Sequence, residues 1–230
     1  MQELSTAWSA LRAGGPMVYP LVALGVIALI IMLDRALASA RMLRRPAALV
    51  DLIETYGFAW SELERALADL KPVNAYRRFI AVIANNREQP AWWVESRAED
   101  EATNIEKSLG RGLWILETVV TAAPLLGLLG TITGMMQAFE IIGGNGLVAP
   151  TQVTAGVAQA LIATALGLLI AVLALFGFNF YSRIQSHALD HMEQLGSKLI
   201  DHIRLDQAYH DEREEVPVAT IATREGRVAR

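Results

Sequence analysis

Three long uncharged stretches dominate the pattern of hydrophobic and polar positions along the chain. Residues 13–33 carry no charge, and the same holds for residues 118–139 and 141–182. A helix of about 20 apolar residues crosses the hydrocarbon core of a membrane, so each stretch predicts a membrane span. The third stretch is longer than one span requires. Its glycines and Asn145 at 142–146, followed by Pro150, indicate a turn and then a helix start.

The segments between and after these stretches have helical patterns of their own. Short amphipathic helices are expected in the loop after the first span, and one helical pattern runs from Ala91 into the second span with only Gly110 and Gly112 as interruptions. An apolar stripe at 3.5-residue spacing continues past the third span to Ile203, which predicts packing against this loop or against copies of the chain. Beyond Asp206 the sequence is charged and without pattern, so we expect a disordered tail.

The distribution of basic residues predicts the orientation of the spans. Arginines cluster directly after the first span, Lys107 and Arg111 precede the second, and Arg183 follows the third, whereas only Arg12 precedes the first. Basic residues favour the cytoplasmic side, so the N-terminus is expected outside and the C-terminus inside. The first stretch is long for a signal peptide and is followed by Asp34 and Arg35, which favours an uncleaved anchor.

These patterns predict an all-α membrane protein of the helical, inner-membrane type, with three transmembrane helices of which the second and third extend into the cytoplasm. The expected segments are a periplasmic N-terminus (1–12), a first span (13–33), a cytoplasmic helical loop (34–111), a second span (113–141), a periplasmic loop (142–152), a third span (153–182), a cytoplasmic helix extension (183–205) and a disordered tail (206–230).

Composition narrows the possible functions. The chain of 230 residues is 53% hydrophobic, contains no cysteine and carries a net charge of −4. The absence of cysteine excludes disulfides and thiolate metal sites. The negative net charge lacks the excess of basic residues that is typical of a nucleic-acid-binding protein. His187 and His191 are one helical turn apart, but a solvated helix face explains this spacing better than a zinc site. We therefore expect no metal, no cofactor, no nucleic-acid partner and no enzymatic activity.

Small residues recur at helical spacing in the second and third spans. The second reads APLLGLLGTITGMM from Ala123 to Met136, with Gly127, Gly130 and Gly134 suited to close helix approach. The third reads AGVAQALIATALGLLIA from Ala155 to Ala171, and its small stripe consists of Ala160, Thr164, Gly167 and Ala171. The same stripes are typical of ordinary helix packing, and a threonine in a membrane helix usually bonds its own backbone.

Three polar residues are candidates for an ion pathway beside these stripes. Thr131 and Thr164 lie near mid-membrane and predict a narrow polar seam between the two helices. Gln159 either lines a cavity or joins two helices, since an amide in an apolar interior needs a partner. Glu117 is either an entry group at the inner mouth or a carboxylate at the membrane boundary.

The three spans resemble the membrane segments of the ExbB/TolQ/MotA proton-channel family. The resemblance rests on GGPMVYPLVALGVIALIIMLDR at Gly14–Arg35, on APLLGLLGTITGMM, and on GVAQALIATALGLLIA. It implies a homopentamer whose second and third helices line a central pore. That pore would hold an ExbD-like single-span partner in the bacterial inner membrane. Thr131 matches the family's second-span threonine, which faces an aspartate of the partner, and Thr164 matches the third-span threonine. Protonation of that aspartate would produce a motion that is passed to a TonB-like protein.

One residue departs from this resemblance. Many ExbB and TolQ proteins carry glutamate where this chain has Gln159. Glutamine does not take up a proton, so the titrating group is expected on the partner, and sodium coupling stays open. A TolQ-like subunit for envelope integrity and a non-conducting membrane scaffold are the alternative functions.

Overall fold

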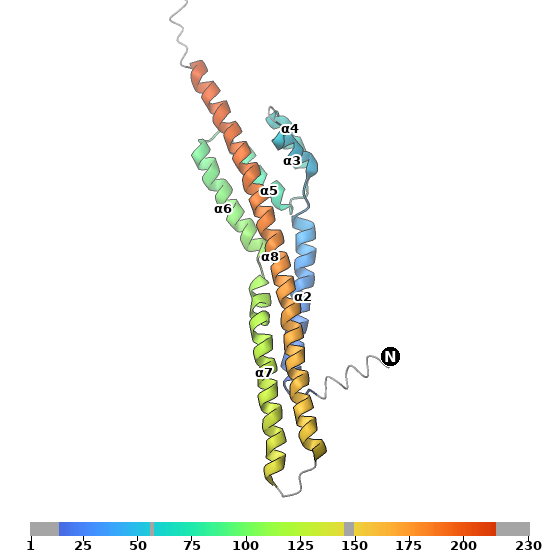
Figure 1. Ribbon diagram of the computed structural model, residues 1–230. Helices are drawn as coiled ribbons and strands as arrows, with labels where there is room; N and C mark the ends of the chain where they lie inside the picture. Colours follow the sequence, from blue (N-terminus) through green and yellow to red (C-terminus); the bar gives the residue numbers. More distant parts are fainter. Residues whose placement is uncertain (1–13, 56–57, 145–149, 215–230) are drawn as a thin grey trace, which may run out of the picture. The chain divides into compact units, whose positions relative to one another are not determined.

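The computed structural model describes residues 14–55, 58–144 and 150–214. Within these residues every regular element is a helix, as Figure 1 shows, and the all-α prediction is confirmed. The helices are α2 (Val18–Met42), α3 (Ala47–Glu54), α4 (Trp60–Ala68), α5 (Ala75–Asn85), α6 (Ala91–Leu109), α7 (Leu113–Gly144) and α8 (Pro150–Glu214). The predicted N-terminal segment 1–12 and part of the predicted loop 142–152 lie outside the described residues.

Three helices in the described part of the chain are long and apolar enough to cross a membrane. They are Val18–Met42, Leu113–Glu140 and Val153–Tyr209, with mean hydropathies of 2.3, 1.8 and 2.6 over their most apolar windows. The prediction of three spans is confirmed by the length and composition of these helices. By its contacts the chain forms two compact units, one of residues 1–40 with 107–186 and one of residues 41–106 with 187–230.

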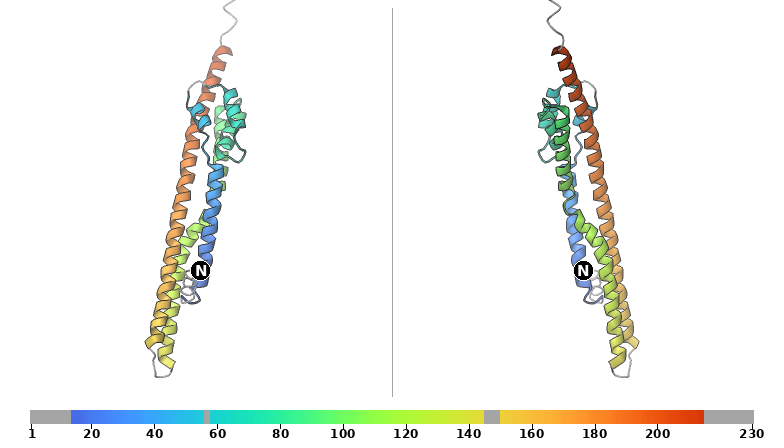
Figure 2. Two further views of the ribbon diagram at one scale, coloured as in Figure 1. Left: turned by 90° about the vertical axis from the view of Figure 1, so that its right-hand side faces the viewer. Right: turned by 90° about the vertical axis from the view of Figure 1, so that its left-hand side faces the viewer.

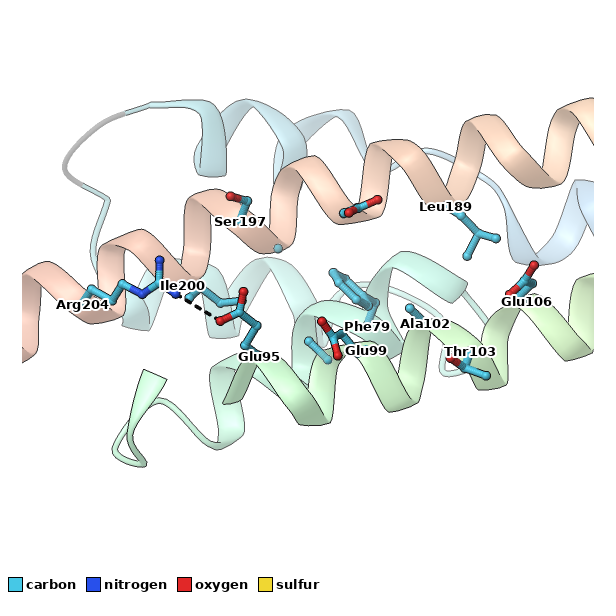
Figure 3. A pocket seen from close by; sticks show the side chains of 13 residues that line it. Phe79, Glu95, Glu99, Ala102, Thr103, Glu106, Leu189, Ser197, Ile200 and Arg204 are labelled. Carbon is cyan, nitrogen blue, oxygen red and sulfur yellow. Dashed lines mark hydrogen bonds and ion pairs between the residues drawn. The ribbon is translucent and has the colours of Figure 1, made fainter. Parts of the chain in front are cut away.

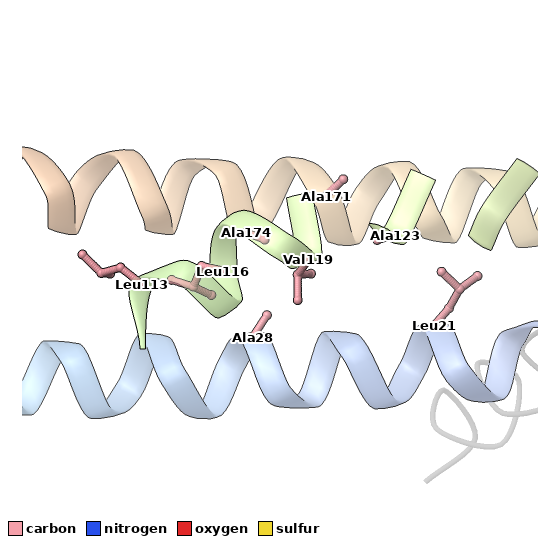
Figure 4. Packing of buried hydrophobic residues seen from close by; sticks show 8 residues of the cluster. All are labelled: Leu21, Ala28, Leu113, Leu116, Val119, Ala123, Ala171 and Ala174. Carbon is pink, nitrogen blue, oxygen red and sulfur yellow. The ribbon is translucent and has the colours of Figure 1, made fainter. Parts of the chain in front are cut away.

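The first unit is a three-helix packing of α2, α7 and the first part of α8, which Figures 1 and 2 show side by side. Figure 4 shows the side chains at its centre, which come from all three helices: Leu21, Ala28, Leu113, Leu116, Val119, Ala123, Ala171 and Ala174. Tyr181 donates a hydrogen bond of 2.8 Å to the carbonyl of Met32, joining α8 to the second half of α2. Small side chains on α8 thus allow α2 and α7 to pack against the same helix.

The second unit packs α3, α4, α5 and α6 against the last part of α8. The apolar stripe of α8 is buried in it: Ala188, Met192, Leu195, Leu199 and Ile203 are each at most 5% exposed. Leu63, Tyr76, Ile80 and Ile83 of the loop helices are also fully buried in this unit. The stripe is therefore covered by the chain's own loop helices, which was one of the two predicted alternatives.

A contact between the buried Tyr76 and the half-buried His191 lies inside this second unit. The Tyr76 hydroxyl is 3.3 Å from Nδ1 of His191. Burial raises the pKa of Tyr76 above its usual value, and the nearby Arg45 guanidinium partly opposes this rise. Burial, with Arg45 and Lys198, lowers the pKa of His191, while Glu54 opposes the change. The environment therefore favours a neutral imidazole at His191.

Two predictions about helix ends are wrong. The helix before the second span does not continue into it: α6 ends at Leu109 and α7 begins at Leu113. Between them Gly112 has φ +85°, a conformation that side-chain-bearing residues rarely adopt, so the second span has no continuous helical extension on this side. The third span, in contrast, does continue without a break, far past residue 182.

The second error concerns the tail predicted from residue 206. Helix α8 extends to Glu214, so residues 206–214 are helical, and only residues 215–230 lie outside the described residues. Two side chains anchor this part to the rest of the second unit. Trp60 Nε1 donates to the Asp206 carboxylate (2.9 Å), and Gln207 donates to the carbonyl of Gln89 (2.8 Å).

Candidate functional site

Helices α7 and α8 run antiparallel and approach closely along their glycines. A Cβ added at Gly127 would lie 3.1 Å from the carbonyl oxygen of Ala163, and one at Gly134 would lie 3.1 Å from the Cβ of Ala160. The closest approach to a backbone atom is at Gly167, where an added Cβ would lie 2.5 Å from the carbonyl oxygen of Ala123. The two backbones are therefore in direct contact, which only small residues permit.

The structure places all six residues predicted for helix packing on buried faces of the first unit. Gly130 faces Ala163, whose Cβ would be 2.5 Å from a Cβ at the glycine. Ala160 is 2% exposed and Ala171 is 7% exposed. Ala171 belongs to the three-helix cluster rather than to the α7–α8 contact alone. The small faces are thus used within one chain, where they pack against each other.

The two threonines make different hydrogen bonds. The Thr164 hydroxyl donates to the carbonyl of Gly127 across the helix contact, at 2.9 Å. The Thr131 hydroxyl donates to the carbonyl of Leu128 in its own helix, at 2.6 Å. Each threonine hydroxyl donates its proton to a backbone carbonyl, and each hydroxyl oxygen still has lone pairs that can accept a hydrogen bond. Toward any further group both threonines therefore present acceptors.

Both threonines lie on the flank of the α7–α8 pair that α2 leaves uncovered. Helix α2 and the residues just before it approach the other flank, where Met17 faces Gly130 and Gly25 faces Ile170. On α7, Gly127 lies about 60° around the helix from Gly130, and Thr131 lies about 40° further in the same direction. Since Thr164 contacts Gly127, the two threonines share one flank. They are half-buried in the isolated chain.

Gln159 lies apart from the threonines, on the flank that faces the N-terminal end of α2. Its side-chain amide is in contact with Gly15, which has φ +75°. The same amide nitrogen is 3.4 Å from the side-chain oxygen of Gln137 on α7. The structure thus has an inter-helix amide pair at Gln159. Gln137 was missed from the sequence, although a second amide within an apolar span was a visible signal.

Glu117 is exposed and lies near the beginning of α7, away from both threonines along the helix. Thr118 and Thr121, which follow it, donate to carbonyls within the helix at 2.8 Å and 3.0 Å. The structure does not bring Glu117 into contact with Thr131 or Thr164.

Arg35 is a further polar residue whose contacts the sequence did not specify. Its side chain is buried and donates to the carbonyls of Ser108 and Leu109, each at 3.2 Å. It also pairs with the carboxylate of Asp34. Arginine thus satisfies the last carbonyls of α6 just before the break at Gly112, as a cation does at a helix C-terminus.

Three apolar membrane helices, two of them joined by backbone contacts between glycines, define a multi-pass helical membrane protein. Its residues 71–194 match the profile of the MotA/TolQ/ExbB proton channel family. The chain belongs to this family, as the resemblance of its spans implied.

Individual relatives agree with this assignment. The chain is 32% identical over 192 residues to a putative biopolymer transport protein, ExbB-like 1, of Synechocystis, covering 81% of this chain and 74% of that protein. It is 44% identical over 79 residues to the biopolymer transport protein ExbB of Aquifex aeolicus, covering 34% of this chain and 53% of that protein. A TolQ protein of the Tol-Pal system from Haemophilus influenzae is 40% identical over 84 residues, covering 36% of this chain and 37% of that protein.

Proposed function

We propose that this chain is an ExbB-like subunit of an ion-driven motor in the bacterial inner membrane. Together with an ExbD-like single-span partner it uses the proton motive force to energise TonB-dependent outer-membrane transport. Membership of the proton channel family supports this proposal, as do several relatives named biopolymer transport protein ExbB. The driving force is adequate, because one charge crossing 100 mV releases about 2.3 kcal/mol.

The ion pathway follows the flank of α7 and α8 that carries Thr131 and Thr164. The observation that supports this placement is that α2 covers the opposite flank, which leaves the threonine oxygens available to a partner helix. Threonine does not titrate. The group that takes up and releases the ion is therefore a carboxylate of the partner, and the threonines accept hydrogen bonds from its protonated form.

Two other predicted residues have secondary roles in this proposal. Glu117, exposed near the beginning of α7, is an entry group at the cytoplasmic mouth of the pathway. Gln159 positions helices through its contact with Gln137 and does not carry the ion. Close packing at small residues holds α7 against α8 and so fixes the positions of the two threonines relative to each other. The residues concerned are Gly127, Gly134, Ala160 and Gly167.

Assembly completes the pathway in this proposal. Five copies surround the partner helix, with α7 and α8 of each copy lining the central pore. The N-terminus is periplasmic and the C-terminus cytoplasmic, in agreement with the basic residues that flank the spans. The large apolar side chains exposed on the single chain contact lipid or neighbouring copies.

The test is the substitution Thr131→Val, expressed with the partner and assayed for partner-dependent transport and for the intact mass of the complex in mild detergent. Thr133→Val is the matched control, since its hydroxyl also bonds carbonyls of α7 at 3.0 Å and 3.2 Å. We expect Thr131→Val to abolish transport with the mass unchanged, and Thr133→Val to keep transport. Full transport in Thr131→Val would contradict the proposed pathway.

A TolQ-like role in envelope integrity is the second candidate, and the similarity to a TolQ protein favours it. The two roles are separated by rescue of strains that lack either TonB-dependent uptake or envelope integrity. Rescue of uptake alone supports the ExbB-like role, and rescue of integrity alone supports the TolQ-like role. A protein that, together with its partner, gives neither proton nor sodium flux in vesicles is a structural scaffold instead.

A further inference from the structure

A groove of about 340 Å³ lies in the second unit between α6 and α8, as Figure 3 shows. Its apolar surface includes Phe79, Leu189 and Ile200. Gly196 makes the groove possible, because a Cβ there would lie 2.8 Å from the ring of Phe79. The groove is thus formed by the packing of the unit itself, in which the Phe79 ring lies against the backbone of α8 at Gly196.

The charge around this groove is one-sided. Four carboxylates line it, against a single guanidinium, and these charged residues are Glu95, Glu99, Glu106, Glu193 and Arg204. The guanidinium is already bound, at 3.1 Å from the Glu95 carboxylate and 3.2 Å from that of Asp201. Among the described residues, Glu99 and Glu193 form no ion pair, and both are exposed. An occupant that suits this groove combines apolar side chains with positive charge.

We propose that this groove binds residues 216–230 of the same chain. This segment follows α8 and has the required chemistry, with Arg224, Arg227 and Arg230 against the single carboxylate of Glu225. Its apolar side chains are interspersed with the arginines: Val216, Val218, Ile221 and Val228. The arginines pair with Glu99 and Glu193, and the apolar side chains contact Leu189 and Ile200.

The length of the segment fits this arrangement. Gly196, at the middle of the groove, lies 18 residues before the end of α8, which is about 27 Å along the helix. Arg224 follows Glu214 by ten residues, and an extended chain of that length spans about 33 Å. A segment that turns back along α8 is therefore long enough to reach the groove. Because it is tethered, its effective concentration at the groove is on the order of millimolar, so a weak site suffices.

The experiment uses the full chain in detergent or nanodiscs and relies on the absence of native cysteine. Val228→Cys is combined with Ala102→Cys, which lies in the groove, or with Ser96→Cys, an exposed control on the same helix outside it. The rate of disulfide formation under mild oxidant is then measured. We expect the groove pair to cross-link at least about tenfold faster, within one chain, and to slow in 1 M salt, where screening acts beyond about 3 Å.

A charge variant separates electrostatic docking from chance proximity. Glu193→Lys in the groove pair should slow cross-linking about tenfold, whereas Asp190→Lys, on the same helix but outside the groove, should leave the rate unchanged. Equal rates for the groove and control pairs, or equal rates for the two charge variants, would overturn the proposal. A disulfide that joins two chains would also overturn it, because the occupant would then belong to a neighbouring copy.

Discussion

Gly167 is the position where the packing of α7 against α8 is most directly testable. In Gly167→Ala the new Cβ would meet the carbonyl oxygen of Ala123 at 2.5 Å and the Cα of Gly127 at 3.1 Å. Both are backbone atoms, so no side-chain rotation relieves the overlap. Ordinary contact begins near 3.4 Å, and the helices must therefore separate by roughly 0.9 Å at this point.

The expected loss of stability follows from this overlap. Inserting a methyl group into a tightly packed site costs about 1–3 kcal/mol, which lowers the ratio of folded to unfolded protein by about 5- to 150-fold. Helix propensity acts in the opposite direction, because alanine is favoured over glycine by about 1 kcal/mol inside a helix. The sign of the measured change therefore reports which effect dominates.

The assay is reversible unfolding in mixed micelles of increasing SDS content, followed by circular dichroism. Gly25→Ala is the matched control, because its Cβ would meet only the side chain of Ile170, at 3.4 Å or more, which is ordinary van der Waals contact. We expect Gly167→Ala to unfold at lower SDS than the parent, and Gly25→Ala to unfold at the same SDS or higher. If Gly167→Ala were as stable as Gly25→Ala, the direct backbone contact between α7 and α8 would be refuted.

Three further predictions concern single side chains. Thr164→Val removes the hydrogen bond to Gly127 and should lower stability by only about 0.6 kcal/mol; a loss several times larger in the SDS assay would contradict this. Arg35→Met leaves the carbonyls at the end of α6 without their donor and should cost about 1.5–3 kcal/mol in that assay, whereas Arg41→Met should be neutral. The lowered pKa of His191 means that the unfolded chain binds the proton more readily, so stability should fall as the pH drops below about 6.5. His191→Gln should flatten that decline in thermal unfolding, and an unchanged pH profile would refute it.

The three membrane helices were predictable because absence of charge over about 20 residues is a strong signal. The burial of Met192, Leu195 and Leu199 followed from periodicity, since a stripe in a helix needs something to cover it. The break between α6 and α7 was not predicted, because an apolar pattern crosses it and Gly110 and Gly112 are tolerated in helices. Only the backbone conformation at Gly112 reveals the break.

The arrangement of the candidate site was harder to predict from the sequence than the membrane helices were. A helical wheel places Thr131 and Gly127 on one face, but it does not indicate which flank a third helix covers. Contacts of Met17 and Gly25 supply that information. The amide pair at Gln159 also depends on where α7 lies relative to α8, and residues 22 positions apart have no pattern in common.

The contacts of Arg35 fix the register of α2 against the end of α6. Its guanidinium is bound to the carbonyls of Ser108 and Leu109 rather than free to extend toward water. Sliding α2 by one turn would shift this side chain by about 5.4 Å, which would break both hydrogen bonds and leave the two carbonyls without that donor. The first span therefore does not move along its axis independently of residues 108–109, so any axial displacement of the helix has to carry this junction with it.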